Sequence, residues 1–163
     1  MHIKRGLRVW GILIKTMKVL ADNKQAKFDY KILETLEAGI ELRGFEVKAA
    51  KSGRINLSGS YARVKGSEVW LINADIQPYQ PKNTPGDYDS QRTRRLLLTK
   101  KEIQTLTGKT SEAGLTLVPL RAYIKGRLVK LELGLARHKK KADKREVIKK
   151  RDADRDIRRA LKN

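Results

Sequence analysis

The chain contains no cysteine and only two histidines. The first absence excludes disulfides, thiolate metal sites and a cysteine nucleophile. His2 lies at the amino terminus and His138 lies in a basic run, so neither has a partner at metal-ligand spacing and neither is placed to act as a general base. We therefore expect neither a metal nor a cofactor.

Acidic residues are scarce, because 18 Asp and Glu face 38 Lys and Arg, and the formal net charge is +20 over 163 residues. Outside the C-terminal segment only Asp87 and Asp89 lie close together, whereas a two-metal nuclease needs grouped carboxylates. This scatter disfavours an enzyme that acts on nucleic acid. The excess of positive charge indicates an anionic partner, either a nucleic acid or a membrane surface.

The sequence also lacks an apolar run of membrane-spanning length. The stretch VWGILI, residues 9–14, has six residues and no small-residue cleavage pattern after it, so it is too short for an export signal or a transmembrane helix. We expect residues 1–16 to be an unstructured extension, with Met17 as a candidate for the true start, and we expect no membrane partner. A membrane-surface protein would need more bulky apolar residues beside its cations.

Residues 137–163 differ from the rest of the chain, since they carry thirteen Lys or Arg against five Asp or Glu and no Gly or Pro. A thin apolar stripe and two acid-before-base pairs at i,i+4 favour a helix by only a few tenths of a kcal/mol per pair. Because helix nucleation is costly in water, we expect a basic tail that is disordered alone and becomes helical on a nucleic acid. The alternative is a solvated tail that only maintains solubility. The stripe consists of Val147, Ala153, Ile157, Ala160 and Leu161.

Residues 17–136 show the pattern of an antiparallel β-barrel with one to three short helices. We expect hairpins that turn at residues 65–67 and at Gly126, and a strand near Ile32 that Gly39 breaks before a second strand around residues 40–42. Short helices are expected over residues 45–51 and, after the capping box of Thr99 and Glu102, up to Gly108. Pro119 predicts a bulge or an edge in the strand that contains it.

The proline-rich residues 78–92 are expected to form a long surface loop. This loop leads into Arg92, Arg94 and Arg95, whose guanidiniums suit phosphate contact, and then into three leucines of which at least two belong to the core. A barrel without a helix-turn-helix, zinc finger or zipper favours structured RNA over DNA. A ribosomal or general translation factor with the same barrel remains an alternative.

Four segments carry a resemblance to a known family. In chain order they are DYKILETLEAGIELRGFEVKAAKSGRINLSGSYARV, EVWLINADIQPY, RTRRLLLTKKEI and GLARHKKKADKRE. Together they resemble the SsrA-binding protein family, also called small protein B, over residues 23–161. The resemblance implies a bacterial cytoplasmic protein, expected to be a monomer, with an oligonucleotide-binding-fold-like (OB-fold-like) barrel and a flexible tail.

The resemblance also implies a function without catalysis. Members bind the tRNA-like domain of transfer-messenger RNA (tmRNA), support its delivery by elongation factor Tu, and bring it to ribosomes stalled on messages without a stop codon. The tail is expected to enter the vacant mRNA channel and contact the decoding region of the small subunit.

Matched position by position, the resemblance implies one set of residues on the barrel and another in the tail. The expected tmRNA-binding residues are Asn23, Lys24, Glu37, Leu97 and Lys130, beside the arginine cluster inferred above. Two positions depart from the family pattern, since His138 stands where glycine is expected and Ala142 replaces an aromatic residue or histidine. The expected ribosome-binding residues of the tail are Arg137, Lys139, Lys140, Lys141, Asp143, Lys144 and Arg145.

Overall fold

The structure is a computed structural model that describes residues 17–112 and 114–162; the extension expected at residues 1–16 lies outside them. The strands are β1 (Lys18–Asp22), β2 (Tyr30–Ile40), β3 (Ile55–Asn56), β4 (Tyr61–Lys65), β5 (Glu68–Ile72), β6 (Asp75–Ile76), β7 (Arg94–Leu97), β8 (Leu115–Lys125) and β9 (Leu128–His138). The helices are α2 (Lys24–Asp29), α3 (Gly44–Lys51), α4 (Lys100–Thr110), α5 (Lys141–Ala160) and the 3-10 turn η1 (Pro81–Asn83).

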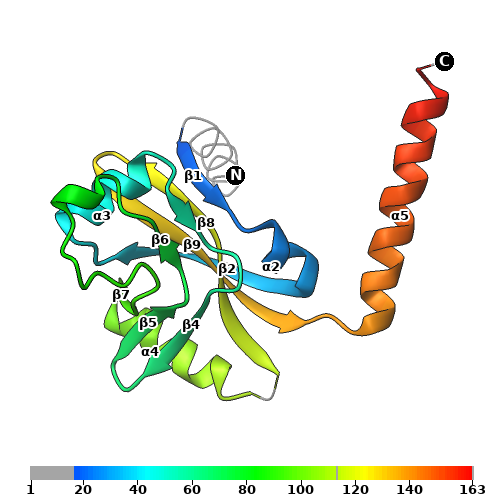
Figure 1. The fold of residues 1–163 in the computed structure, drawn as a ribbon. Helices are drawn as coiled ribbons and strands as arrows, with labels where there is room; N and C mark the ends of the chain where they lie inside the picture. Colours follow the sequence, from blue (N-terminus) through cyan, green and yellow to red (C-terminus); the bar gives the residue numbers. More distant parts are fainter. Residues whose placement is uncertain (1–16, 113, 163) are drawn as a thin grey trace, which may run out of the picture.

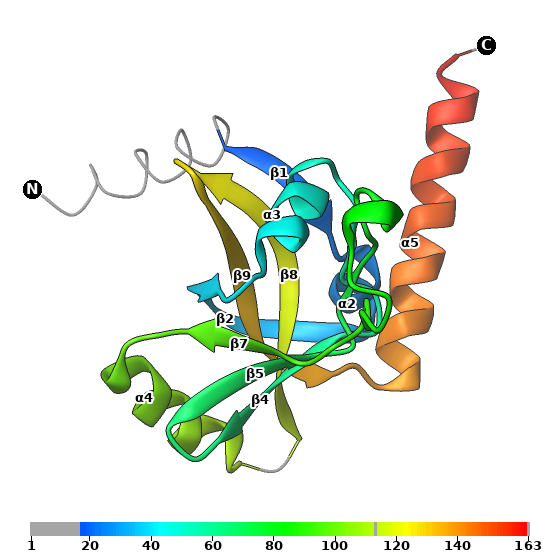
Figure 2. The ribbon, with the colours of Figure 1, turned by 60° about the vertical axis from the view of Figure 1, so that its left-hand side comes forward.

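Six strands close into an antiparallel barrel in the order β8, β4, β5, β7, β2, β9, and β9 pairs again with β8 (Figures 1 and 2). β4 meets β8 only at the pair Ala62 and Leu117, and β1 takes the rest of that edge, with Asp22 opposite Arg121. The predicted mainly-β architecture is therefore confirmed. The predicted hairpin turns at Gly66 and Gly126 are also present, and both glycines have a positive φ of 62°.

Alternation along each strand separates the barrel interior from its outer face. On β5, Val69 and Leu71 are fully buried, while the residues between and beside them face outward. They pack with Leu117, Leu131 and Leu133, which are no more than 1% exposed. Each such side chain contributes about 1.5–3 kcal/mol when it is fully buried. The core thus fixes which side chains the outer face presents.

Gly39 does not break β2, which runs without interruption from Tyr30 to Ile40. A Cβ at Gly39 would lie 3.1 Å from the Cβ of Leu97 on β7, so the glycine permits a close approach of two paired strands. The strand expected around residues 40–42 is also wrong, since the chain leaves the sheet after Ile40 and α3 begins at Gly44. The strand bulges at Pro119, as predicted, because the β8–β9 register shifts between Pro119 and Arg121.

The capping box before α4 is confirmed, with Thr99 Oγ1 accepting from the Glu102 backbone N–H and Glu102 accepting from the Thr99 N–H. The helix continues to Thr110, beyond the end predicted at Gly108. Within the proline-rich loop, Tyr88 anchors the chain by donating to the Ile76 carbonyl oxygen at 2.9 Å. The end of the loop is also held, because Arg92 donates to Glu46 and the Ser90 carbonyl oxygen accepts from Arg94.

The tail forms a 20-residue helix, α5, which projects from the barrel and meets it near α2 (Figures 1 and 2). The helix is the form that the tail was expected to take on a nucleic acid. Asp143 accepts a hydrogen bond from the Lys140 backbone N–H at the first turn, and Lys144 forms a 2.7 Å ion pair with Asp29 of α2. A capped and anchored first turn lowers the nucleation cost on which the expectation rested.

Candidate nucleic-acid interface

Three of the residues expected to contact RNA, Glu37, Leu97 and Lys130, lie together on the outer face of the barrel. Leu97, Gly39 and Lys130 lie directly opposite one another on β7, β2 and β9, so they share one face, and Glu37 is two residues before Gly39 on the same face. Leu97 is 50% exposed, whereas Leu96 beside it is buried. The sheet register therefore assembles an exposed apolar side chain, a cation and a carboxylate from three separate segments.

Glu37 is held as an oriented carboxylate. Burial by itself would raise the pKa of Glu37, but hydrogen bonds from the Tyr123 hydroxyl and from Lys125 Nζ, 3.0 Å from Oε1, outweigh it and hold this pKa below its ordinary value. Burial and the hydrogen bond to Glu37 raise the pKa of Tyr123, so its hydroxyl stays a donor. Glu37 is therefore an anionic acceptor at neutral pH, with lone pairs that suit a base amino group or a ribose hydroxyl.

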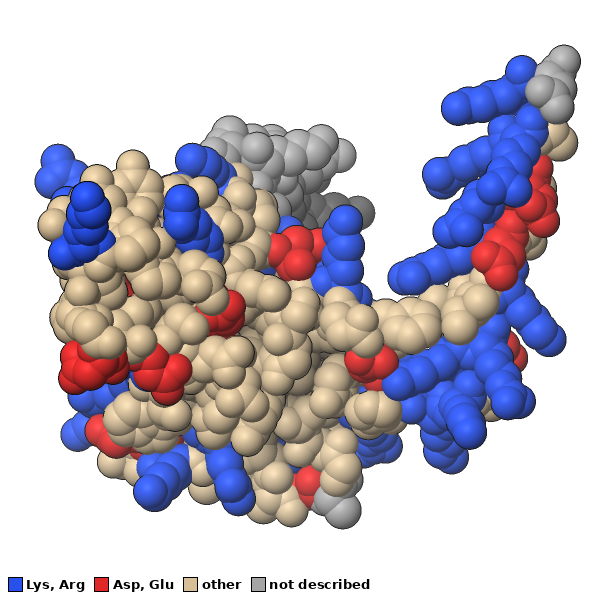
Figure 3. All heavy atoms as spheres, viewed as in Figure 1, with Lys and Arg blue, Asp and Glu red and all other residues tan. Residues whose placement is uncertain are grey.

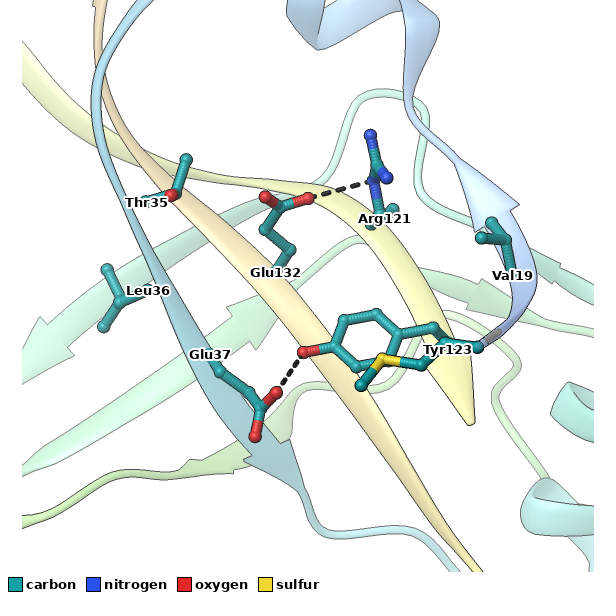
Figure 4. A pocket seen from close by; sticks show the side chains of 8 residues that line it. Val19, Thr35, Leu36, Glu37, Arg121, Tyr123 and Glu132 are labelled. Atoms are coloured by element: carbon teal, nitrogen blue, oxygen red, sulfur yellow. Dashed lines mark hydrogen bonds and ion pairs between the residues drawn. The ribbon is translucent and has the colours of Figure 1, made fainter. Parts of the chain in front are cut away.

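A small pocket lies beside this carboxylate, between β1, β2, β8 and β9 (Figure 4). Glu37 and Tyr123 form one wall, and Arg121 with Glu132 forms another. Arg121 Nε and Glu132 Oε2 form an ion pair at 2.9 Å, in which the N–H does not point at the carboxylate oxygen. The volume of about 110 Å³ is below the range of about 300–1,000 Å³ that is usual for ligand pockets, so the pocket is too small to hold a nucleotide.

Two of the three clustered arginines pair with a buried carboxylate. Arg94 is fully buried and Arg92 is half-buried, and both donate to Glu46 of α3, with Arg92 Nη2 at 2.6 Å and Arg94 Nη2 at 2.9 Å. The expectation that Arg94 contacts phosphate is wrong, because its guanidinium is buried and donates its hydrogen bonds to Glu46 and to backbone carbonyl oxygens. Arg95, with 48% of its side chain exposed, is the member that can reach a phosphate.

Asn23 is also internal, at 2% exposure. Its side-chain amide donates to the carbonyl oxygens of Leu57 and Pro119, and its Oδ1 accepts from the Ala26 N–H as the N-cap of α2. The expected contact of its side chain with RNA is therefore corrected, since every hydrogen-bonding atom of the amide is occupied within the fold. Lys24, the next residue, is exposed on the first turn of α2.

The tail presents its cations around an isolated helix, and Lys and Arg side chains cover most of the α5 surface in Figure 3. A helix of 20 residues is about 30 Å long. Lys140, Lys141 and Arg145 are exposed near its start, and Arg137 is exposed at the end of β9. Lys139 and Lys144 are half-buried, because Lys139 donates to the Lys27 carbonyl oxygen and Lys144 pairs with Asp29.

Comparison with known proteins decides the family. The family model described as SmpB protein matches residues 20–163. The chain belongs to the SmpB family. An SsrA-binding protein from Gloeothece citriformis is 52% identical over 145 residues, which cover 89% of this chain and 94% of the relative. The SsrA-binding protein of Carboxydothermus hydrogenoformans is also 52% identical, over 89% of this chain and 97% of its own.

A solved structure of an SmpB complex is similar as well. In the work described as "tmRNA-SmpB: a journey to the center of the bacterial ribosome", one chain matches with a TM-score of 0.63 and 44% identity, over 78% of this chain and 93% of that chain. The resemblance inferred from the four sequence segments is therefore confirmed. The residues that this SmpB family member would use for RNA stay predictions.

Two further findings concern the described residues alone. None of the helices in residues 17–112 and 114–162 is long and apolar enough to cross a membrane. The same part of the chain contains no group of three or more His, Asp or Glu that could hold a metal ion.

Sequence reasoning missed Glu46, on which the arginine cluster depends. Its signal was the position three residues after Arg43, where its carboxylate accepts from the Arg43 N–H at the start of α3. Without the fold, nothing in the sequence showed that this helix start would pack against the strand carrying Arg94.

Proposed function

We propose that this SmpB family member binds tmRNA through its barrel, brings it to stalled ribosomes for trans-translation, and places its helical tail in the empty mRNA channel. The observation that carries the proposal is the 44% identical chain of the tmRNA-SmpB structure, which shares the fold over most of both chains. The protein acts as an RNA-binding factor with no catalysis of its own.

The geometry supports a division of labour between barrel and tail. On the barrel, Glu37, Leu97 and Lys130 offer an acceptor, an apolar contact and a cation within one outer face, which suits recognition of a folded RNA by shape and by ribose and base edges. The tail offers dense positive charge on a slender rod, which suits a channel lined by phosphates.

The remaining partners follow from this role. We infer that elongation factor Tu contacts the complex through alanyl-tmRNA, that the protein acts as a monomer in the cytoplasm, and that Lys140, Lys141, Asp143 and Arg145 meet ribosomal RNA. The half-buried Lys144 must exchange Asp29 for RNA, or remain as the anchor of the tail.

Capture of RNA tests the proposal. The full chain, tagged at its amino terminus, is recovered from a bacterial lysate and its bound RNA is sequenced. We expect tmRNA to be enriched over tRNA and ribosomal RNA when ribosomes are removed beforehand. Enrichment of ribosomal RNA or tRNA without tmRNA would instead assign the protein to another translation function.

A further inference from the structure

A second part of the outer face carries a half-buried tryptophan between two exposed arginines. Arg63 on β4, Trp70 on β5 and Arg95 on β7 lie directly opposite one another, so the three side chains form a row on one face. Trp70 is half-buried, and both arginines are exposed. We call this row and the hollow beside it the Trp70 surface.

The cations of this surface are available to a ligand. The Arg63 side chain makes no hydrogen bond or ion pair with another residue of the described ranges, and the Arg95 side chain forms one ion pair there, at 3.4 Å with the exposed Glu68 side chain. An exposed pair of this kind contributes about 0–1 kcal/mol, so a phosphate can replace Glu68 at little cost. The cation–π contacts among the described side chains involve Phe28 and Tyr79, so no cation of the described residues lies over the Trp70 ring.

A hollow of about 720 Å³ lies over Trp70, lined by Arg63, Lys65, Glu68, Ile72 and Thr93 among others. Its size falls within the range of ligand sites, and it is open to solvent rather than enclosed. Two cations, Arg63 and Lys65, line the hollow with one acid, Glu68, and Arg95 lies beside Trp70 on the next strand. This excess of positive charge favours an anionic ligand. An aromatic plane flanked by guanidiniums is the arrangement with which proteins hold an unpaired base and its phosphates.

The Trp70 surface is continuous with the face that carries Glu37 and Lys130. β7 belongs to both, because Arg95 and Leu97 are two residues apart and point to the same side of the strand. An RNA seated against Leu97 therefore has a neighbouring cation at Arg95 and an aromatic plane one strand further.

We propose that the Trp70 surface is a second RNA-binding site, in which one unpaired nucleotide stacks its base on Trp70 while Arg63 and Arg95 hold the adjacent phosphates. This inference rests on the proposed RNA-binding function and adds a site to it. The ligand chemistry is single-stranded RNA, which tmRNA and the small ribosomal subunit can each supply.

Tryptophan fluorescence tests the stacking directly. The chain has two tryptophans, so the full-length W10F variant reports on Trp70 alone. It is titrated separately with tmRNA and with small ribosomal subunits. Quenching of Trp70 by at least one of them supports the site and identifies its source, and the absence of quenching by both at saturation overturns it.

Substitutions in the same W10F background separate stacking from folding. W70L should weaken binding to the quenching RNA by about five- to a hundredfold, because it keeps an apolar side chain but removes the π-face, whereas W70F should stay within about threefold of the parent. R63A and R95A should each lower the salt dependence of binding by about one counterion, and R127A, which removes an exposed cation from the β8–β9 turn, should leave Trp70 quenching unchanged.

E68Q gives a prediction of opposite sign. It frees Arg95 and removes the acid of the hollow, so binding should tighten by roughly two- to fivefold. A W70L variant that binds both RNAs like its parent, or an E68Q variant that weakens binding, contradicts the proposal. If the unmodified protein does not bind tmRNA, the proposed function itself is contradicted.

Discussion

Replacement of Glu46 by alanine should severely destabilise the barrel. The carboxylate is fully buried and accepts five hydrogen bonds, two each from Arg92 and Arg94 and one from the Arg43 N–H, while the Tyr88 hydroxyl oxygen lies 3.0 Å from its Oε1. The variant leaves the Arg94 guanidinium buried without its counter-charge. Among the donors, Arg94 loses the most stability when its partner is removed, because it is 0% exposed and water cannot replace the carboxylate.

Two independent arguments give the magnitude. Removal of one partner from a buried ion pair costs about 3–5 kcal/mol of unfolding free energy. Burial alone would raise the pKa of Glu46, but hydrogen bonds from Arg92, from the Arg43 N–H and from Arg94 lower it from 4.5 to about 2. That shift corresponds to about 3 kcal/mol, at the lower end of the same range.

The pH dependence of stability follows from the sign of the shift. The folded-state pKa is depressed, so the stabilisation from Glu46 is complete above pH 4.5 and is lost as the pH falls towards 2. E46Q has no carboxyl to titrate. The difference in unfolding free energy between the unmodified protein and E46Q should therefore shrink by about 3 kcal/mol between pH 5 and pH 2.

Urea unfolding followed by circular dichroism measures these differences. With a denaturant slope of about 1–3 kcal/mol/M, a loss of 3–5 kcal/mol moves the midpoint down by roughly 2 M. E112A, which removes an exposed carboxylate, serves as the matched control and should stay within about 0.5 kcal/mol of the parent. An E46A loss below 1 kcal/mol, or a gap to E46Q that does not vary with pH, would refute the reasoning.

Three further predictions concern function and the tail. E37Q should weaken tmRNA binding about tenfold or more in a gel-shift titration, since it removes a charged acceptor, while E34Q on the same strand should have little effect. The tmRNA dissociation constant should rise steeply with KCl, and a flat response would contradict phosphate contact. D29N should broaden the distance distribution between spin labels on S58C and K150C, because it breaks the Asp29 anchor of α5; an unchanged distribution would show that this ion pair does not orient the helix.

Much of the fold could be predicted from local sequence signals. The hairpin glycines, the capping box of Thr99 and Glu102, and the bulge at Pro119 each depend on a few neighbouring residues, and each is present. Gly39 was misread because the reason for it is Leu97, a residue of a strand far along the chain. The sequence alone does not distinguish a glycine that ends a strand from one that lets a side chain of the neighbouring strand pack against its Cα.

The candidate site shows the same limit. Charge indicated a polyanionic partner, and the family resemblance singled out Glu37, Leu97 and Lys130, but their shared face comes from strand register. Arg94 was misassigned because three neighbouring arginines look alike in sequence, and only the fold shows that Glu46 pairs with two of them and that Arg94 is buried. The anchor between Lys144 and Asp29 likewise joins residues that are far apart in the chain.

Removal of the tail tests the central claim most directly. A chain that ends at His138, the last residue of β9, is compared with the full chain for tmRNA affinity and for peptide tagging on ribosomes stalled at the end of a message. The account predicts tmRNA affinity within a few-fold of the full chain at physiological salt, with tagging abolished. Loss of tmRNA binding in step with tagging, or tagging that survives truncation, would contradict the division between a barrel that binds tmRNA and a tail that acts on the ribosome.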